Sequence, residues 1–181
     1  WHQDQFAPSE YESFILPGGF SYGDYLRSGA LAAHSNSMKS LREAAEKGFP
    51  IFGICNGFQI LCEAHLLPGT LLRNSERRFM DKMISLKMEN AHSRFGTKLS
   101  KGEVVKMPIA HADGRYHVTE QELKEIQDNG QVYATYHSNP NGSAGNIAGV
   151  MNKNKNVVGM MPHPERAIHK WMGSDDGRKF F

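Results

Sequence analysis

The feature that most constrains this sequence is a short apolar run that passes directly into a cysteine flanked by glycines. The run Ile51-Phe52-Gly53-Ile54 is typical of a buried strand, and Phe58 to Leu66 has helical spacing. Between them lies Gly53-Ile54-Cys55-Asn56-Gly57, a G-x-C-x-G motif. In a nucleophile elbow the nucleophile occupies a strained strand-to-helix turn, and glycines two residues to either side are needed because the two backbones crowd together. The motif therefore predicts an exposed turn that carries a nucleophilic cysteine.

Further strands and helices alternate around this motif. We expect a strand at Ser13 to Leu16, ended by Pro17-Gly18-Gly19, and an amphipathic helix from Ser28 to Lys47, ended by Gly48 and Pro50. This order predicts an α/β fold with a doubly wound, mostly parallel, flavodoxin-like sheet and helices on both faces. Ligands of such a sheet bind beyond the carboxyl ends of its strands.

The middle of the sequence predicts a small antiparallel region. Ile84, Leu86 and Met88 alternate with polar residues, as in a half-exposed strand. The residues Thr119 to Glu122 predict a capping box at the start of a helix that ends at Asn129-Gly130. The other predicted strands are Val104 to Ile109, Gln131 to Tyr136, Ile147 to Val150 and Val157 to Met161.

Composition excludes several classes of protein. The 181 residues are 22% charged and 39% hydrophobic, the balance of one folded domain, 1–181. A net charge of +2 without a run of like charge gives nucleic acid no obvious binding surface, and no apolar run approaches the roughly 18 residues of a membrane span. Two cysteines and no signal peptide favour the cytoplasm.

Cys55 is the predicted nucleophile. The helix N-terminus beyond it is expected to lower the pKa of the thiol, and the Asn56 N–H is placed to bind a developing oxyanion. Gly19, or Gly18 one residue earlier, is expected to supply the second oxyanion donor, because glycines after a strand let backbone N–H groups face a ligand. Cys62, two helical turns further on and without flanking glycines, is expected in the core.

His163 is the predicted base, because it closely follows the apolar run Val157 to Met161 at the end of a strand. Glu165, two residues on, is placed to orient the imidazole as the third member of a triad. The remaining histidines show no metal-ligand spacing, so no metal site is predicted.

Taken together, Leu16-Pro17-Gly18-Gly19, Gly53-x-Cys55-x-Gly57-x-Gln59 and His163-Pro164-Glu165 resemble the class I (triad) glutamine amidotransferases. Longer stretches resemble the small stand-alone glutaminase subunits of phosphoribosylformylglycinamidine synthase, over essentially the whole chain. These stretches are Gly18 to Ala30, Cys55 to Gln59, Pro108 to His111 and Gly159 to Arg166. That family begins with about thirty further residues. The resemblance thus implies that this sequence, which starts at Trp1, lacks an N-terminal βα segment. Because no stop signal follows Gly177, we also expect the end of a C-terminal helix to be missing.

The resemblance implies Cys55 as nucleophile, His163 as base and acid, and Glu165 as its partner, with Gln59 and Gly18 binding glutamine. It also implies partners, namely a synthetase subunit and a small accessory subunit of phosphoribosylformylglycinamidine synthase. No cofactor is expected in this chain. The sequence contains no G-x-x-x-x-G-K-[ST] motif, so ATP and Mg²⁺ are expected on the synthetase.

Two other functions remain open at this stage. The same elbow would serve a cysteine peptidase or related hydrolase, and a non-catalytic binding module could retain the fold. Ser21 to Arg27 is equally ambiguous. Ser21 can cap a helix in which Asp24 and Arg27 pair, and its two tyrosines can contact a partner protein.

Overall fold

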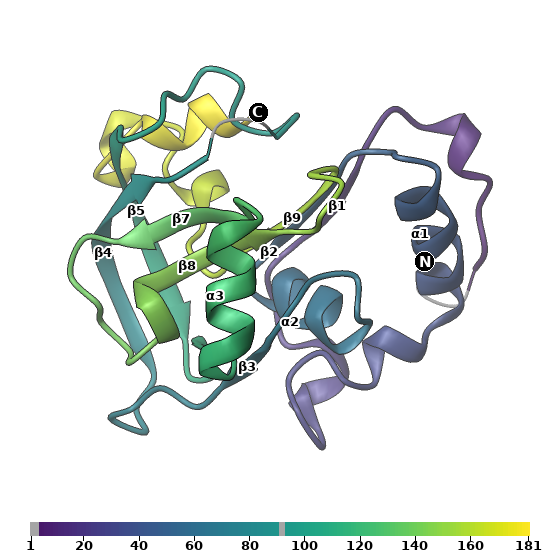
Figure 1. The fold of residues 1–181 in the computed structure, drawn as a ribbon, viewed down its shortest axis with the longest axis horizontal. Helices are drawn as coiled ribbons and strands as arrows, with labels where there is room; N and C mark the ends of the chain where they lie inside the picture. Colours follow the sequence, from purple (N-terminus) through teal and green to yellow (C-terminus); the bar gives the residue numbers. More distant parts are fainter. Residues whose placement is uncertain (1–3, 91–92) are drawn as a thin grey trace.

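The structure, a computed structural model, describes residues 4–90 and 93–181, and its centre is a seven-stranded sheet (Figure 1). The strand order is β1-β2-β9-β8-β7-β4-β5, with a separate two-stranded sheet of β3 and β6. The strands are β1 (Phe14–Leu16), β2 (Ile51–Ile54), β3 (Thr70–Leu72), β4 (Met80–Met88), β5 (Val104–His111), β6 (Arg115–His117), β7 (Val132–Tyr136), β8 (Ile147–Met151) and β9 (Val157–Met160). The α-helices are α1 (Asn36–Glu46), α2 (Asn56–Glu63) and α3 (Glu120–Asp128).

The α/β class is confirmed, but the sheet is mixed and not mostly parallel. Only β1, β2 and β9 run parallel to one another. Strands β8, β7, β4 and β5 follow in antiparallel pairs within the same sheet, so the antiparallel region is larger than predicted. The reason is visible between Met151 and Val157, where a short turn joins β8 to β9. A parallel crossover would need a dozen or more residues.

The two faces of the parallel strands are covered differently. Helix α2 lies on the face that Gly53 and Gly159 leave free of side chains, so that Phe58 and Leu61 approach the strand backbones. On the opposite face, Phe52 stacks on Phe95 with ring centroids 4.9 Å apart, and the C-terminal Phe181 adds a second contact. Helix α1 lies at the β1 end of the molecule, and β4 and β5 lie at the other end (Figure 1).

The sheet curls, so that its far edge returns to the parallel strands. In the sheet, β8, β7 and β4 separate β9 from β5. Nevertheless the N–H of His163, just after β9, donates to the carbonyl of Pro108 in β5 at 2.9 Å. The carbonyl of Ala110, in the same strand, lies 3.8 Å from the sulfur of Cys55 after β2. The ends of β2, β9 and β5 therefore meet at one place.

Two predicted helices differ in the structure. The helix expected from Ser28 begins only at Asn36, because Gly29 adopts a φ of +84° and packs against the backbone of Ile60 in α2. The helix expected at Ser21 is a 3-10 turn in which Tyr22 and Gly23 are left-handed, and Ser21 does not cap it. Arg27 pairs with Glu63 of α2 at 2.6 Å and not with Asp24. The C-terminal residues Asp176–Phe180 form a 3-10 helix.

The remaining predicted elements agree with the structure to within a few residues. Thr119 caps α3 through the expected capping box, in which Glu122 N donates to Thr119 Oγ1 at 3.2 Å and Thr119 N to the Glu122 carboxylate at 2.8 Å. Strands β3 and β6 were not predicted. None of the helices in the described part of the chain is long and apolar enough to span a bilayer.

Candidate active site

Cys55 occupies the predicted turn between β2 and α2 in a strained backbone conformation. Its φ is 50° and its ψ −104°, a combination that costs a non-glycine residue about 1–3 kcal/mol. The Cys55 N–H donates to the carbonyl of Met160 in β9 at 2.8 Å, and its carbonyl accepts from Gln59 N at 3.1 Å. Bonds to a strand on one side and to the first turn of α2 on the other hold this conformation in place.

The two glycines of the motif have the steric role that the sequence predicted. A Cβ on Gly57 would overlap the backbone carbonyl of Leu16 in β1, and a Cβ on Gly53 would lie 2.7 Å from the backbone of Gly57. Strand β1, strand β2 and helix α2 thus approach one another more closely than any side chain allows. The G-x-C-x-G pattern is a packing requirement of the turn.

His163 and Glu165 form a hydrogen-bonded pair beside Cys55. His163 Nδ1 lies 2.6 Å from Glu165 Oε1, and the imidazole is buried. Because a carboxylate only accepts hydrogen bonds, Nδ1 is the donor in this pair, and in the neutral imidazole Nε2 presents a lone pair. Nε2 is buried without a hydrogen-bond partner among the described residues. A nitrogen in this state is available to take a proton from a substrate or a nucleophile.

Gly18 lies where the cysteine and the histidine come together. A Cβ built on Gly18 would lie 2.7 Å from His163 Cε1 and 3.5 Å from Cys55 Cβ. Gly19 follows at a φ of +150°, a region open to glycine, and lines the same cavity as Cys55. The structure thus brings both glycines to the site, and their roles as oxyanion donor and as substrate contact stay predictions.

The pKa of the Cys55 thiol is raised and not lowered, which corrects the sequence prediction. Burial raises this pKa from 9.0 to about 12, an effect that outweighs the hydrogen bond from the Asn56 N–H. The nearby Glu165 and Asp24 carboxylates contribute to this rise, and Arg166 opposes it. In the structure Cys55 is therefore a neutral thiol near pH 7, and nucleophilic attack requires transfer of its proton to a base.

Asn56 and Gln59 link the elbow to two neighbouring segments. Asn56 Oδ1 accepts from the Ser21 N–H at 3.2 Å, and Asn56 Nδ2 donates to Gln59 Oε1 at 2.9 Å. Gln59 Nε2 in turn donates to the carbonyl of Asp113 at 2.7 Å. Gln59 thus positions the Asp113 segment beside the elbow, and its predicted contact with glutamine stays a prediction.

The elbow opens into a cavity of about 190 Å³ that both Cys55 and His163 line. This volume is below the about 300–1,000 Å³ of sites for drug-sized ligands, so it suits a molecule of amino-acid size. Several polar side chains also line the cavity. Its polar lining residues besides Cys55 and His163 are Asp24, Ser28, Gln59, His111, Asp113 and Arg166.

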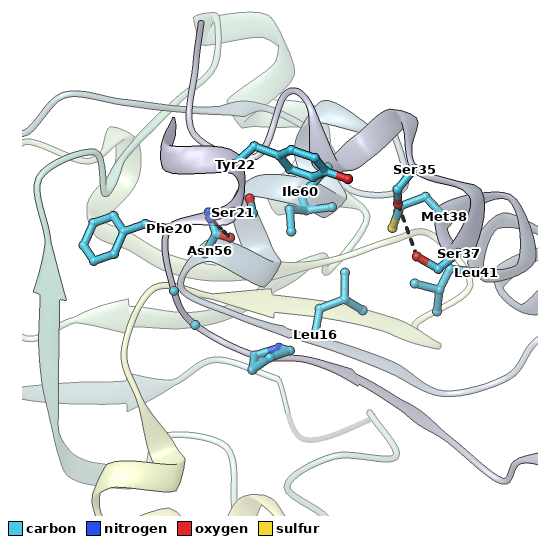
Figure 2. A pocket seen from close by; sticks show the side chains of 14 residues that line it. Leu16, Phe20, Ser21, Tyr22, Ser35, Ser37, Met38, Leu41, Asn56 and Ile60 are labelled. Carbon is cyan, nitrogen blue, oxygen red and sulfur yellow. Dashed lines mark hydrogen bonds between the residues drawn. The ribbon is translucent and has the colours of Figure 1, made fainter. Parts of the chain in front are cut away.

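A larger cavity of about 500 Å³ is also lined by the Gly18 to Tyr22 segment (Figure 2). Its walls are largely apolar, with Leu16, Met38, Leu41 and Ile60 around it. Figure 2 also shows the Ser21–Asn56 hydrogen bond that fastens this segment to α2. Because neither Cys55 nor His163 lines this larger cavity, we assign the chemistry to the smaller one.

Sequence analysis missed the residues that β5 and its following turn bring to the cavity. Ala110, His111 and Asp113 line it, and Ser28 Oγ donates to Asp113 Oδ2 at 3.0 Å. The available signal was their position directly after a predicted strand. Cys62 is buried in α2, as predicted, and within the described residues no group of three His, Cys, Asp or Glu side chains is arranged to hold a metal ion.

Comparisons with known proteins agree with this geometry. The chain is similar to a chain in the structure of PurLQS from Thermotoga maritima, with 46% sequence identity and a TM-score of 0.89. The match covers 98% of this chain and 79% of that chain. A glutamine amidotransferase from the same organism has 18% identity, a TM-score of 0.58 and coverage of 87% of this chain and 57% of its own, a likeness of fold alone.

The family model of the CobB/CobQ-like glutamine amidotransferase domain matches residues 2–179, nearly the whole chain. The strained cysteine, the His163–Glu165 pair and the small cavity all lie within the matched residues. This chain belongs to the CobB/CobQ-like glutamine amidotransferase family.

Proposed function

We propose that this chain hydrolyses glutamine and supplies the ammonia to a synthetase that makes formylglycinamidine ribonucleotide in purine biosynthesis. One observation carries the proposal. A strained Cys55 and a hydrogen-bonded His163–Glu165 pair line one small cavity, in a chain 46% identical to a chain of PurLQS. The cavity of about 190 Å³ is closer to the size of an amino acid than to that of a peptide.

The first chemical step forms a glutamyl thioester on Cys55. The cysteine begins as a thiol, because burial raises its pKa to about 12, so its proton passes to His163 Nε2 as the sulfur attacks the carboxamide carbon. Glu165 stabilises the resulting imidazolium through Nδ1. The N–H groups of Asn56 and Gly19 bind the oxyanion, and His163 then gives its proton to the departing nitrogen, which leaves as ammonia.

The second step releases glutamate. His163 takes a proton from water as the water attacks the thioester carbonyl, and the collapse of this intermediate breaks the carbon–sulfur bond. The thiolate recovers its proton from His163, which returns the site to its starting state. Each cycle consumes one glutamine and one water and yields one glutamate and one ammonia.

Ammonia is useful only if it reaches the acceptor before it is protonated, so we assign a docked synthetase to this chain. Large apolar side chains stand exposed around the cavity, as at Phe20 and Phe79, which line it, and at Tyr25 and Leu26 nearby. Tyr25 is 74% exposed and Leu26 86%. Aromatic side chains are enriched at protein interfaces. We assign ATP and Mg²⁺ to the synthetase, include a small accessory subunit in the complex, and place the reaction in the cytoplasm.

The proposal is tested with a diazo-ketone analogue of glutamine, followed by mass spectrometry, with and without the synthetase. We expect a single adduct on Cys55 that excess glutamine prevents. Cys62 serves as an internal control, because it is buried in α2 and, unlike Cys55, does not line the cavity.

No adduct in either condition, with Cys55 still open to a small alkylating agent, would reject glutamine as substrate. Turnover of peptides without a partner would instead support the peptidase. An unreactive Cys55 under every condition would support a non-catalytic module.

A further inference from the structure

His111, at the end of β5, is a buried histidine that the triad mechanism does not use. Only 3% of the residue is exposed, and it lines the same cavity as Cys55 and His163. Its Nε2 is buried without a hydrogen-bond partner among the described residues. A buried polar atom in this state costs about 1–3 kcal/mol, so it requires an explanation.

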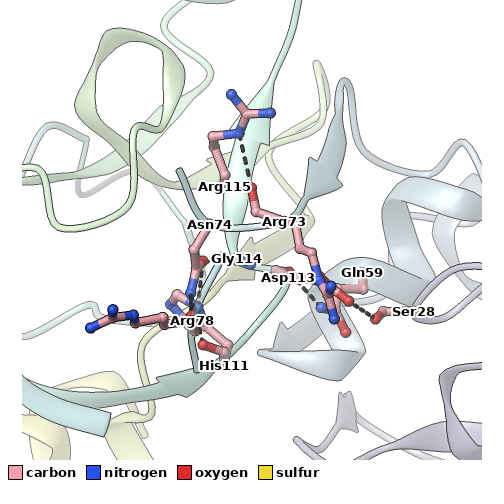
Figure 3. A network of polar contacts seen from close by, with 9 residues as sticks. All are labelled: Ser28, Gln59, Arg73, Asn74, Arg78, His111, Asp113, Gly114 and Arg115. Atoms are coloured by element: carbon pink, nitrogen blue, oxygen red, sulfur yellow. Dashed lines mark hydrogen bonds and ion pairs between the residues drawn. The ribbon is translucent and has the colours of Figure 1, made fainter. Parts of the chain in front are cut away.

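The hydrogen bonds around Asn74 fix which nitrogen of His111 carries a proton (Figure 3). Asn74 Nδ2 donates to the carbonyls of Arg78 at 2.8 Å and His111 at 2.9 Å. Because both neighbours are acceptors, this atom is the amide nitrogen, and Asn74 Oδ1 is the acceptor. Oδ1 lies 3.1 Å from His111 Nδ1 and also accepts from Gly114 N at 3.2 Å. His111 Nδ1 is therefore the donor.

The charge of the imidazole follows from its surroundings. Burial, with a smaller contribution from the neighbouring His163, lowers the pKa of His111 from 6.5 to about 4. The Asp113 carboxylate acts in the opposite direction but does not reverse the shift. Near pH 7 the ring is neutral and protonated on Nδ1, so that Nε2 is a hydrogen-bond acceptor.

The packing of the ring determines which edge faces the cavity. Gly114 lies against Cγ, Nδ1 and Cε1 of His111 so closely that a Cβ on Gly114 would overlap the ring. This contact and the bond to Asn74 occupy one edge, which leaves the Nε2–Cδ2 edge for the cavity that His111 lines. The preceding residue, Ala110, places its carbonyl 3.8 Å from Cys55 Sγ, so the end of β5 that carries His111 is close to the reacting sulfur.

We propose that His111 Nε2 accepts a hydrogen bond from the carboxamide N–H of bound glutamine and so selects an amide over other acyl groups. The inference rests on the proposed function and deepens it. No group in the described part of the chain hydrogen-bonds to Nε2, whereas a primary amide at Cys55 brings two N–H donors to this part of the cavity. Asn74 and Gly114 are positioning residues, because they act through His111.

The test compares glutamine with glutamate γ-methyl ester, which offers the same acyl carbon but has no N–H on its leaving group. The complex with the synthetase is assayed with His111→Asn and His111→Gln. In His111→Asn the new amide nitrogen reproduces the Nδ1 donor to Asn74 but nothing reaches the position of Nε2. In His111→Gln the amide oxygen reaches the position of Nε2 and restores an acceptor there.

We expect His111→Asn to lower kcat/KM for glutamine about 10- to 100-fold and to change kcat/KM for the ester by less than about threefold. His111→Gln should recover most of the preference for the amide. Labelling of Cys55 by the diazo-ketone analogue, which also lacks an amide N–H, should continue in both variants. Thermal unfolding of each variant reports whether it is folded.

The proposal is overturned if His111→Asn lowers both activities equally, since a merely structural role predicts that result, or if it leaves the amide preference unchanged. If His111→Asn fails to fold, His111→Gln decides, because loss of amide preference in this folded variant contradicts an acceptor role. A wild-type complex that labels at Cys55 but shows no preference for the amide rejects this inference alone. One that neither labels nor hydrolyses glutamine rejects the proposed function and this inference together.

Discussion

The parallel and antiparallel halves of the sheet contribute differently to the site. Strands β1, β2 and β9 are followed within a few residues by Gly19, Cys55 and His163, groups that we assign to the chemistry. The antiparallel half reaches the site through the end of β5, which brings Ala110 and His111, and through Phe79 directly before β4. The parallel half thus holds the reacting atoms, and the antiparallel half forms the wall that faces them. A site of this kind separates reaction from recognition, and variants in the two halves should fail in different ways.

The largest effect is expected from the nucleophile. Cys55→Ala should lower glutamine-dependent synthesis by about 10⁴-fold or more, because no other group can form the thioester. Synthesis from added ammonia should be unchanged in the complex, and both rates are measured on the same preparation. Cys62→Ala, in the same helix but in the core, is the matched control and should keep both activities. Loss of the ammonia-dependent rate in Cys55→Ala would contradict this division of labour.

The second effect concerns the hydrogen bond between Glu165 and the base His163. Glu165→Gln keeps the shape of the side chain but loses the charge that stabilises the imidazolium 2.6 Å away. We expect kcat for glutamine to fall about 10²- to 10⁴-fold, with a smaller change in KM. Glu125→Gln, on the exposed face of α3, controls for loss of a carboxylate elsewhere. An unchanged kcat would remove Glu165 from the mechanism.

The third effect is on folding and contrasts two glycines. Gly57→Ala forces a Cβ against the Leu16 carbonyl where β1 meets α2, so we expect the free energy of unfolding to fall by about 3 kcal/mol or more. Gly102→Ala, in the turn between β4 and β5, meets open space and should cost only about 1 kcal/mol for its φ of +85°. Chemical denaturation measures both. Equal losses would show that crowding at the elbow is not the reason for Gly57.

The contrast between the halves also explains what the sequence predicted well. The elbow, its glycines and the His163–Glu165 pair are local patterns, and their placement at strand ends follows from the alternation of short apolar runs with helices. The sequence predicted a smaller antiparallel region than the one that β8, β7, β4 and β5 form. The short turn between Met151 and Val157 could have indicated an antiparallel pair, because a parallel connection needs more residues.

Other features depend on tertiary structure. Ala110 and His111 directly follow a predicted strand, but the return of β5 to His163 depends on the curl of the whole sheet, which the neighbouring residues do not indicate. The pKa of Cys55 was predicted in the wrong direction because the helix N-terminus is visible in the sequence, whereas burial is not. Gly29 interrupts the predicted helix because of its contact with Ile60, a tertiary reason.

The fourth effect is on the pH dependence of folding stability, through His111 in the antiparallel half of the sheet. Because folding lowers the pKa of His111 from 6.5 to about 4, the unfolded chain binds a proton in this range that the folded chain does not. The stabilising contribution is therefore complete above pH 6.5 and is lost as the pH falls toward 4. We expect His111→Gln to flatten this part of the stability profile by on the order of 2 kcal/mol. The exposed His137→Gln is the control, and an unchanged slope in His111→Gln would contradict the shift.

The smallest effect separates strain from packing within one helix. Cys55 holds a φ of 50° that glycine adopts freely, so Cys55→Gly should be more stable than Cys55→Ala by about 1 kcal/mol. At Cys62, in the regular part of α2, the order should reverse, because glycine in a helix costs about 1 kcal/mol relative to alanine. Four unfolding curves give both differences. If alanine is more stable than glycine at both positions, the elbow stores no strain, and Cys55 would then owe its place at the site to the closely packed glycines alone.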